Sequence, residues 1–253
     1  MIELSLAFFA LAVPAVVFAG VSKAGFGSGA SFAAAPILAL ILDPLTALGL
    51  LLPLYIVIDL ATLRPYWGRW SLRNAALLML GSLPGVALGA SLLLTASDDV
   101  FRVLIGALAL AFVGWSLLKA RGVIPLRRRP FPRIVGILTG LTAGFTSTIS
   151  HAGGPPVAVY LLAQGLSKTT YQATTVLVFW AVNLAKAVPY AALGVFTAET
   201  LWAGVLLAPV ALFGAWLGVR IHHHLPEPLF FRITYFLLSV TGAKLVWDGL
   251  SGG

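Results

Sequence analysis

The sequence of 253 residues contains no cysteine and is poor in charge. Without cysteine the chain can form no disulfide, carry no thiolate nucleophile and build no cysteine-based metal site. Charged residues make up only 9% of the chain, whereas hydrophobic residues make up 60%. A soluble domain of this length could not cover its surface with so few charges, because a folded globule needs polar groups over much of its outside. The sequence therefore predicts an integral membrane protein.

Long apolar runs fill nearly the whole chain, which has a mean hydropathy of +1.00. A helix needs about 17 to 25 residues to cross roughly 30 Å of hydrocarbon. Runs of about this length lie at 4–21, 24–42, 44–63, 74–95, 100–118, 134–148, 150–166, 170–195, 200–219 and 229–248. Continuous runs favour helices over a β-barrel, whose strands alternate in segments of about ten residues. The first run begins with Glu3 and no basic residue, so we predict a retained helix rather than a secretory signal.

The charges between the runs predict a topology. Arg121, Arg127, Arg128, Arg129 and Arg133 cluster in one loop, which the positive-inside rule places in the cytoplasm. Counting crossings from this loop, we expect the loops with Arg64, Arg69, Arg73, Lys168, Arg220 and His222 to His224 inside, and those with Asp98, Asp99 and Glu199 outside. Both termini are then outside, in the periplasm, if the first and second runs cross as a pair and so do the sixth and seventh. The runs at 24–42 and 150–166 either span the membrane fully or are re-entrant. The net charge of +8 is loop charge on this account and does not indicate nucleic acid, and the three histidines are expected in a solvated loop rather than on a metal.

The second half of the chain repeats the first. GVSKAGFGSGASFAAAP at 20–36 aligns with GLTAGFTSTISHAGGPP at 140–156, and IDLATLRPY at 58–66 aligns with VNLAKAVPY at 182–190. Later landmarks follow in the same order: Pro84, Gly89 and Ala90 match Pro209, Gly214 and Ala215, and Phe101-Arg102 matches Phe231-Arg232. Such an ordered set of matches at offsets of 120 to 130 indicates an internal duplication.

Equivalent loops of the two halves carry opposite charge, which predicts that the repeats are inverted relative to each other. An odd number of apolar runs per repeat, five, produces this inversion because the second copy enters the membrane from the other side. We predict a first repeat at 1–120, a basic cytoplasmic linker at 121–133 and a second repeat at 134–253. Inverted repeats are typical of secondary transporters, whose substrate sites lie near mid-membrane where the repeats meet.

Small and hydroxyl residues interrupt both halves at equivalent places. They are Ser22, Gly25, Gly27, Ser28, Gly29 and Ser31 in the first half and Thr146, Ser147, Thr148, Ser150, Gly153 and Gly154 in the second. Irregular backbone survives at membrane depth only where protein buries it or a cavity receives it. A helix that restarts behind each break would point unpaired N–H groups at an anion. The alternative is close helix packing, which we favour for Gly81, Gly85, Gly89, Gly214 and Gly218.

Ionisable residues inside or beside apolar runs are further candidates, because each costs roughly 2.5 to 3.5 kcal/mol at a helix centre. His151 is expected to donate to the anion or carry a coupled proton, or else to bond a backbone carbonyl as a neutral side chain. Lys186 is expected to supply positive charge to the site, to pair with Asp59, or to snorkel. Asp59 is either a gate residue or a partner of Arg64. Arg102 and Arg232 are expected to be interfacial or structural.

These motifs resemble the sulfite exporter TauE/SafE family of membrane permeases. The resemblance rests on AGFGSGASFAAAPIL and AGFTSTISHAGGPPVAVYLL, each opening a half that continues through a proline-glycine helix to a last helix led by Phe-Arg. It covers about residues 7–248. The usual family motif is close to G-x-G-G-G-x-x-x-x-P, and here Ser147, Thr148, Ser150 and His151 replace most glycines of the second copy. The resemblance implies transport of sulfite, sulfoacetate and related organosulfonates across bacterial inner membranes.

We therefore expect a secondary transporter, in the direction of export, that moves a small sulfur-containing anion by alternating access. The expected substrate site comprises Lys23, Gly27, Ser28, Gly29, Ser31, Ser147, Thr148, Ser150, His151, Gly153, Gly154, Asn183 and Lys186, with Asp59 and His151 as gate or coupling residues. The expected partners are the anion, the lipid bilayer and protons as the candidate coupling ion, with no cofactor or metal. The alternatives are a passive anion channel, a membrane-embedded enzyme and an assembly subunit. The sequence has no HExxH or GxSxG motif, which disfavours the enzyme.

Overall fold

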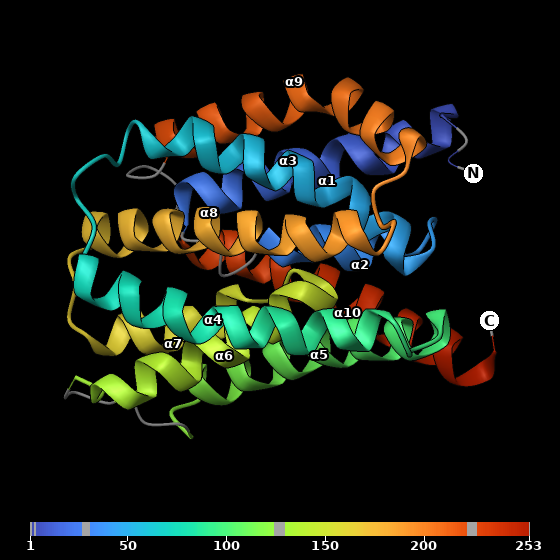
Figure 1. Ribbon diagram of the computed structural model, residues 1–253. Helices are drawn as coiled ribbons and strands as arrows, with labels where there is room; N and C mark the ends of the chain where they lie inside the picture. The colour runs from blue at the N-terminus through green and yellow to red at the C-terminus, as the bar shows by residue number, and fades with distance from the viewer. Residues whose placement is uncertain (1, 3, 27–30, 124–129, 222–226, 253) are drawn as a thin grey trace.

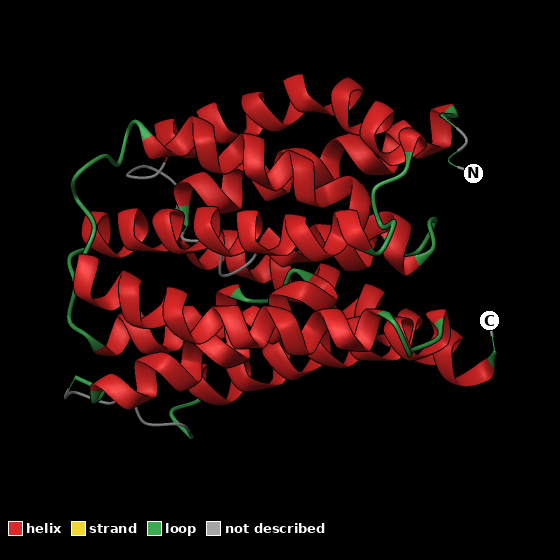
Figure 2. Ribbon diagram, viewed as in Figure 1, coloured by secondary structure: helices red, strands yellow, loops and turns green. Residues whose placement is uncertain are grey.

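The computed structural model describes the chain except for residues 1, 3, 27–30, 124–129, 222–226 and 253, and the side chains of 227–230. All regular structure in the described residues is helical, which confirms the predicted all-α fold (Figure 2). The elements are α1 (Leu6–Gly25), the 3₁₀ turn η1 (Ser31–Ala33), α2 (Ala34–Leu38), α3 (Pro44–Leu63), α4 (Leu72–Leu93), α5 (Asp98–Ala120), α6 (Arg133–Ser150), α7 (Gly154–Ala163), α8 (Lys168–Ala192), α9 (Ala198–Ile221) and α10 (Glu227–Ser251).

Six of these helices, α1, α3, α4, α5, α8 and α9, are long and apolar enough to cross a membrane. Their starts follow local sequence signals: Ser5, Ser97 and Ser167 each cap a helix by accepting a hydrogen bond from the backbone N–H three residues later, which satisfies one of the free donors of the first turn. Most of the predicted apolar runs therefore correspond to long helices, with bounds that differ by a few residues.

The runs at 24–42 and 150–166 behave differently, because each contains only a short helix. α2 has 5 residues and α7 has 10, which at 1.5 Å per residue is at most half of the membrane thickness. Both turn back toward the end where the preceding helix began. The residues after α2 line a cavity with Glu199, which bonds the N–H of Ile2, and Gln164 at the end of α7 donates to the carbonyl of Phe131, just before α6. Neither segment therefore spans the molecule as one long helix, which is consistent with broken or re-entrant helices.

The long helices form two bundles and a separate pair (Figure 1). In one bundle α1 and α3 pack against α9, in the other α6 and α8 pack against α4, and α5 pairs with α10. The bundles meet where α3 contacts α8. Both chain ends lie at one end of the molecule, and the connections α3–α4, α5–α6 and α7–α8 lie at the opposite end (Figure 1).

Glycines allow the closest of these helix contacts. A Cβ atom at Gly81 or Gly85 of α4 would overlap a backbone carbonyl of α6, and one at Gly214 or Gly218 of α9 would come within 2.8 Å of a backbone carbonyl of α1. At Gly89 an added Cβ would lie 2.6 Å from that of Thr148. The packing interpretation of these five glycines is therefore confirmed, and it explains how helix backbones approach closely without large side chains between them.

Candidate functional site

Asp59 of α3 lies at the centre of the first polar cluster, between the two bundles. Its Oδ1 is 2.8 Å from Nζ of Lys23 in α1, and its Oδ2 accepts a 2.6 Å hydrogen bond from Asn183 in α8. At most 3% of any of these side chains is exposed. Nζ of Lys23 also lies 5.0 Å from the ring centroid of Tyr55. Asp59 therefore pairs with neither Arg64 nor Lys186, the two partners considered from sequence, because α1 brings a closer cation to it.

Lys186 of α8 forms the second cluster together with the break after α6. Its Nζ donates to the carbonyl and the hydroxyl of Ser147, at 3.1 and 3.0 Å, and lies 2.8 Å from Nδ1 of His151. Lys186 is fully buried, so it does not snorkel. Among the described residues no carboxylate forms an ion pair with it.

The hydrogen bonds of His151 fix its tautomer. Nε2 lies 3.2 Å from the carbonyl oxygen of Leu48, which can only accept, so Nε2 carries a hydrogen. Nδ1 faces the amine of Lys186, and one hydrogen can occupy that 2.8 Å contact. The His151–Lys186 pair therefore carries one positive charge when Lys186 is an ammonium, and none when both side chains are neutral.

The backbone at His151 is left-handed, with φ at 56°, the only such non-glycine residue among those described. Its N–H bonds the carbonyl of Ser147, and the N–H of Ala152 bonds that of Thr146, which is the usual hydrogen bonding where a helix ends in a left-handed residue. The break thus lies at 151–153, later than the hydroxyl-rich stretch predicted. Thr146, Thr148 and Ser150 remain helical, and their hydroxyls bond carbonyls of their own helix, which a helix tolerates.

Side chains from neighbouring elements satisfy the carbonyls at the two helix ends. Tyr190 donates to the carbonyl of Thr148 at 2.6 Å. The carbonyl of Ala24 accepts from Tyr66 at 2.8 Å and from the Nε2 of Gln172 at 3.0 Å. Burial raises the pKa of Tyr66, which follows α3, to about 12, so this hydroxyl stays protonated and able to donate at physiological pH. Each broken helix end is therefore held by a tyrosine.

A small cavity lies between the two clusters. Its volume is about 10 Å³, which is room for about one water. Its lining residues are Lys23, Ser31, Tyr55, Ser147, His151, Gly154, Phe179 and Asn183. Six of these are predicted site residues, and Lys186 adjoins them through Ser147 and His151. The sequence interpretation missed the two aromatic residues, as well as Gln172, which is conspicuous as an amide in an apolar helix.

The other predicted site residues have different positions. Gly153 is closely packed, since a Cβ there would lie 2.8 Å from the carbonyl of Ala143. Thr148 and Ser150 are bonded within α6, as described above. Gly27, Ser28 and Gly29 lie outside the described residues. At the start of α7 two of the first three residues are Pro155 and Pro156, which lack an N–H, so this helix end offers fewer backbone donors to an anion than predicted.

Two larger cavities flank the central one. A cavity of about 650 Å³ lies at the end of the molecule where α5 ends and α8 begins, and it reaches Gly25 and Phe26 at the end of α1. A cavity of about 400 Å³ lies at the other end, beside Asp43, Arg102 and Glu199. The polar clusters are thus enclosed between two openings on opposite ends.

Comparison with known proteins identifies the family. A family model described as Sulfite exporter TauE/SafE matches residues 12–245. The chain belongs to the TauE/SafE family. No curated protein and no solved structure matches it. The match spans both helix breaks, and together with six membrane-length helices it makes this TauE/SafE protein a multi-pass membrane protein. The family consists of transporters, which is consistent with the prediction that the chain is not an enzyme.

Proposed function

We propose that this TauE/SafE protein is a secondary transporter that exports a small sulfur-containing anion, such as sulfite, sulfoacetate or another organosulfonate, by alternating access. The observation that carries the proposal is the buried amine of Lys186, which contacts His151 and forms no ion pair with a carboxylate of the described residues. Asp59 and Lys23 neutralise each other, so a protonated Lys186 adds one uncompensated positive charge to the central site. A buried charge is costly unless an opposite charge accompanies it, and an anionic substrate would provide it.

The donors around the cavity suit an oxyanion. Lys186 has an ammonium group with three hydrogens, and the hydroxyl of Ser147 and the ring of His151 adjoin it. A sulfite or sulfonate group presents several oxygen acceptors in a compact pyramid, so it can replace the contacts that Lys186 now makes to Ser147. In a water-poor site such charge-assisted bonds are stronger than in water. That the proposed anion contains sulfur rests on the family, which is described as a sulfite exporter.

We infer that the fold consists of two inverted repeats. Three observations support this. The equivalent residues Asp59 and Asn183 bond each other, the equivalent Tyr66 and Tyr190 each hold the end of a broken helix, and the packing of α9 on α1 and α3 corresponds to that of α4 on α6 and α8. Each repeat thus contributes one helix to the other repeat's bundle. We propose that the bundles, rather than the repeats, move against each other about the α3–α8 contact.

The enclosed central cavity favours a transporter over a passive channel. About 10 Å³ holds one water and no continuous pore, whereas the larger cavities end on either side of it. The clusters must separate to admit an anion, as alternating access requires. The linker at 121–133 carries most of the loop arginines, so we propose that the 650 Å³ cavity opens to the cytoplasm and that both termini are periplasmic, in a bacterial inner membrane.

Protons are the proposed coupling ion. The groups that face His151 are Lys186, the ring of Tyr55 at 4.8 Å and the ring of Tyr190 at 6.5 Å. A substrate anion that binds Lys186 would free Nδ1 to accept a second proton, so anion and proton could move together. We expect flux of sulfite to respond to a pH gradient in the native protein and to lose this response in His151→Gln. Unchanged gradient dependence in that variant would exclude coupling through His151.

Counterflow of radiolabelled sulfite in proteoliposomes tests the main proposal. We expect saturable uptake and counterflow for the native protein, and a loss of about tenfold or more for Lys186→Met, which removes a charged donor. Arg69→Gln, which removes an exposed cation, is the matched control and should transport normally. Unsaturable flux without counterflow would indicate a channel. Normal transport by Lys186→Met would contradict the assigned site.

A further inference from the structure

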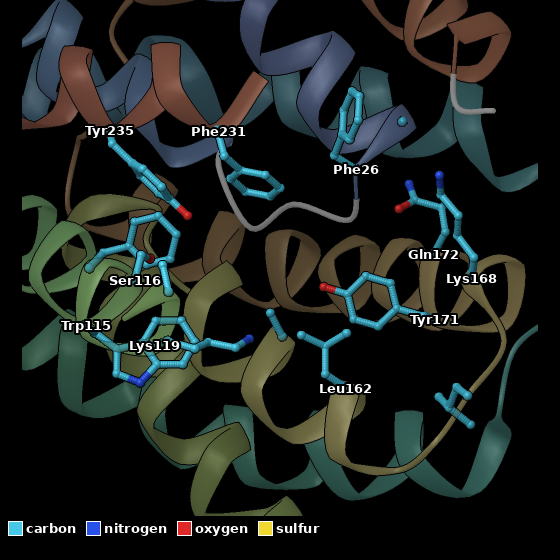
Figure 3. A pocket seen from close by; sticks show the side chains of 15 residues that line it. Phe26, Trp115, Ser116, Lys119, Leu162, Lys168, Tyr171, Gln172, Phe231 and Tyr235 are labelled. Atoms are coloured by element: carbon cyan, nitrogen blue, oxygen red, sulfur yellow. The ribbon is translucent and has the colours of Figure 1, made fainter. Parts of the chain in front are cut away.

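The 650 Å³ cavity is large enough to hold a ligand of its own. Its volume lies in the range of about 300–1,000 Å³ that is typical of small-molecule sites, and it is far larger than sulfite requires. One wall comes from α5 and α10, and the other from the end of α1 with α7 and α8 (Figure 3). Aromatic rings line both walls, including Trp115, Tyr171 and Phe231. Such a lining suits a flat apolar body.

One wall offers groups for an anion. Lys119 points into the cavity in Figure 3, and its Nζ lies 5.2 Å from the ring centroid of Trp115. No Asp or Glu is among the described residues that line the cavity, and no carboxylate of the described chain pairs with Lys119. One turn earlier on the same helix, Ser116 is 6% exposed and also lines the cavity. A cation and a hydroxyl therefore adjoin on one helix face.

The opposite wall offers a buried acceptor. Gln172 is 1% exposed, and its Nε2 donates to the carbonyls of Lys23 and Ala24 at 2.7 and 3.0 Å. Carbonyls only accept, so the amide cannot be flipped. Its Oε1 is consequently directed away from α1, has no hydrogen-bond partner in the described structure, and points toward the cavity from the side opposite Lys119 (Figure 3). A buried acceptor without a donor is costly, and a ligand donor would remove that cost.

The geometry points to an elongated organic anion as the ligand of this cavity: one with an anionic group for Lys119 and Ser116, a flat apolar body for the aromatic walls, and an N–H or O–H donor at its far end for Gln172. Neither sulfite nor sulfoacetate has a flat apolar body, so this ligand differs from the substrates named for the central cavity. The inference does not depend on transport, because binding can be measured on the purified full-length protein in detergent.

Three matched probes test the inference by calorimetry: para-(hydroxymethyl)benzoate, its methyl ether, and the corresponding neutral benzamide. We expect the native protein to bind the acid alcohol, and to bind the ether about 3- to 10-fold more weakly because the donor for Gln172 is missing. We expect the benzamide to bind about tenfold more weakly because it lacks the charge that pairs with Lys119.

Variants assign each contact. Lys119→Gln should remove the preference for acid over amide, whereas Lys244→Gln, which removes an exposed cation on α10 that pairs with Asp248, should change nothing. Gln172→Met should remove the preference for alcohol over ether. Because Gln172 also holds the end of α1, Ala158→Phe is a second variant that fills the cavity from α7 and should abolish binding of all three probes.

The inference is overturned if the native protein binds none of the probes, or binds alcohol and ether equally. It is also overturned if Lys119→Gln and Lys244→Gln behave alike, or if Ala158→Phe binds normally. Its outcome is separable from that of the central site. Lys186→Met should bind the probes as the native protein does, so failure of sulfite transport alongside normal probe binding would affect only the proposed function.

Discussion

At the scale of single residues, the most consequential contact is the buried ion pair of Lys23 and Asp59. Taking two charges out of water is expensive, and their attraction offsets this only while both are present. Asn183 satisfies the second oxygen of Asp59, so the carboxylate is fully engaged. The pair therefore specifies how α1 meets α3 more than it adds to stability.

This view predicts opposite results for single and double variants. Lys23→Met should lower the free energy of unfolding by about 3–5 kcal/mol because it leaves a buried carboxylate without a cation. Lys23→Met combined with Asp59→Leu should recover most of that loss. Unfolding in detergent followed by circular dichroism measures both. Equal destabilisation by the single and the double variant would show that the ion pair contributes net stability.

The left-handed backbone at His151 makes a second residue-scale prediction. Both His151→Gly and His151→Ala remove the imidazole and its bonds to Lys186 and Leu48, but only alanine retains a Cβ that is unfavourable at a φ of 56°. His151→Gly should therefore be more stable than His151→Ala by about 1–2 kcal/mol. Thermal unfolding of the two variants provides the comparison, and equal stability would mean that the turn relaxes when the imidazole is lost.

At the scale of elements, the two tyrosines that hold the broken helix ends are not equivalent. The carbonyl of Thr148 has Tyr190 as its hydrogen-bond donor, whereas that of Ala24 has both Tyr66 and Gln172. Tyr190→Phe should thus leave a buried acceptor unpaired and cost about 1–3 kcal/mol, with a smaller loss for Tyr66→Phe. Chemical denaturation of both variants tests the order, and the reverse order would contradict this account of the helix ends.

Close packing of α4 on α6 gives another prediction at this scale. Gly85→Ala would place a methyl group against the carbonyl of Leu141, whereas Gly204 of α9 has no atom within 4 Å of the corresponding position. We expect Gly85→Ala to cost about 1–3 kcal/mol through overpacking. Gly204→Ala, the matched control, should be neutral or slightly stabilising because alanine favours the helix. The melting temperatures of the two variants test this. Equal melting temperatures would contradict close packing at Gly85.

Helix positions were predictable from sequence, whereas most contacts of the site were not. The apolar runs indicate the helices and the loop arginines indicate the connections, because both signals are local in the sequence. Of the residues predicted for the site, His151 and Ser147 lie at the second break and line one cavity, and Lys186, predicted as a cation inside an apolar run, contacts both. However, Lys23 meets Asp59 only through the tertiary packing of α1 against α3, and nothing near Asp59 in sequence favours Lys23 over Arg64. Tyr66 and Tyr190 stood in the aligned stretch of the two halves, and that equivalence was a usable signal.

At the scale of the whole molecule, the two flanking cavities make alternating access testable. Because the chain has no cysteine, a thiol reagent labels only a cysteine that is introduced by substitution. Ser116 lines the 650 Å³ cavity and Thr46 lines the 400 Å³ cavity at the other end. In right-side-out vesicles a membrane-impermeant thiol reagent should label Thr46→Cys but not Ser116→Cys, and inside-out vesicles should give the reverse, if the linker at 121–133 is cytoplasmic.

Substrate should then change the two labelling rates in opposite directions. If the bundles move as units about the α3–α8 contact, opening one cavity closes the other, so sulfite or a pH gradient that slows labelling of Ser116→Cys should accelerate that of Thr46→Cys. Lys186→Met in the same background should remove the effect of sulfite, because the anion no longer distinguishes the two states. A channel would leave both cavities open together, and the two rates would then rise or fall in parallel. That result would exclude alternating access while leaving the anion site intact.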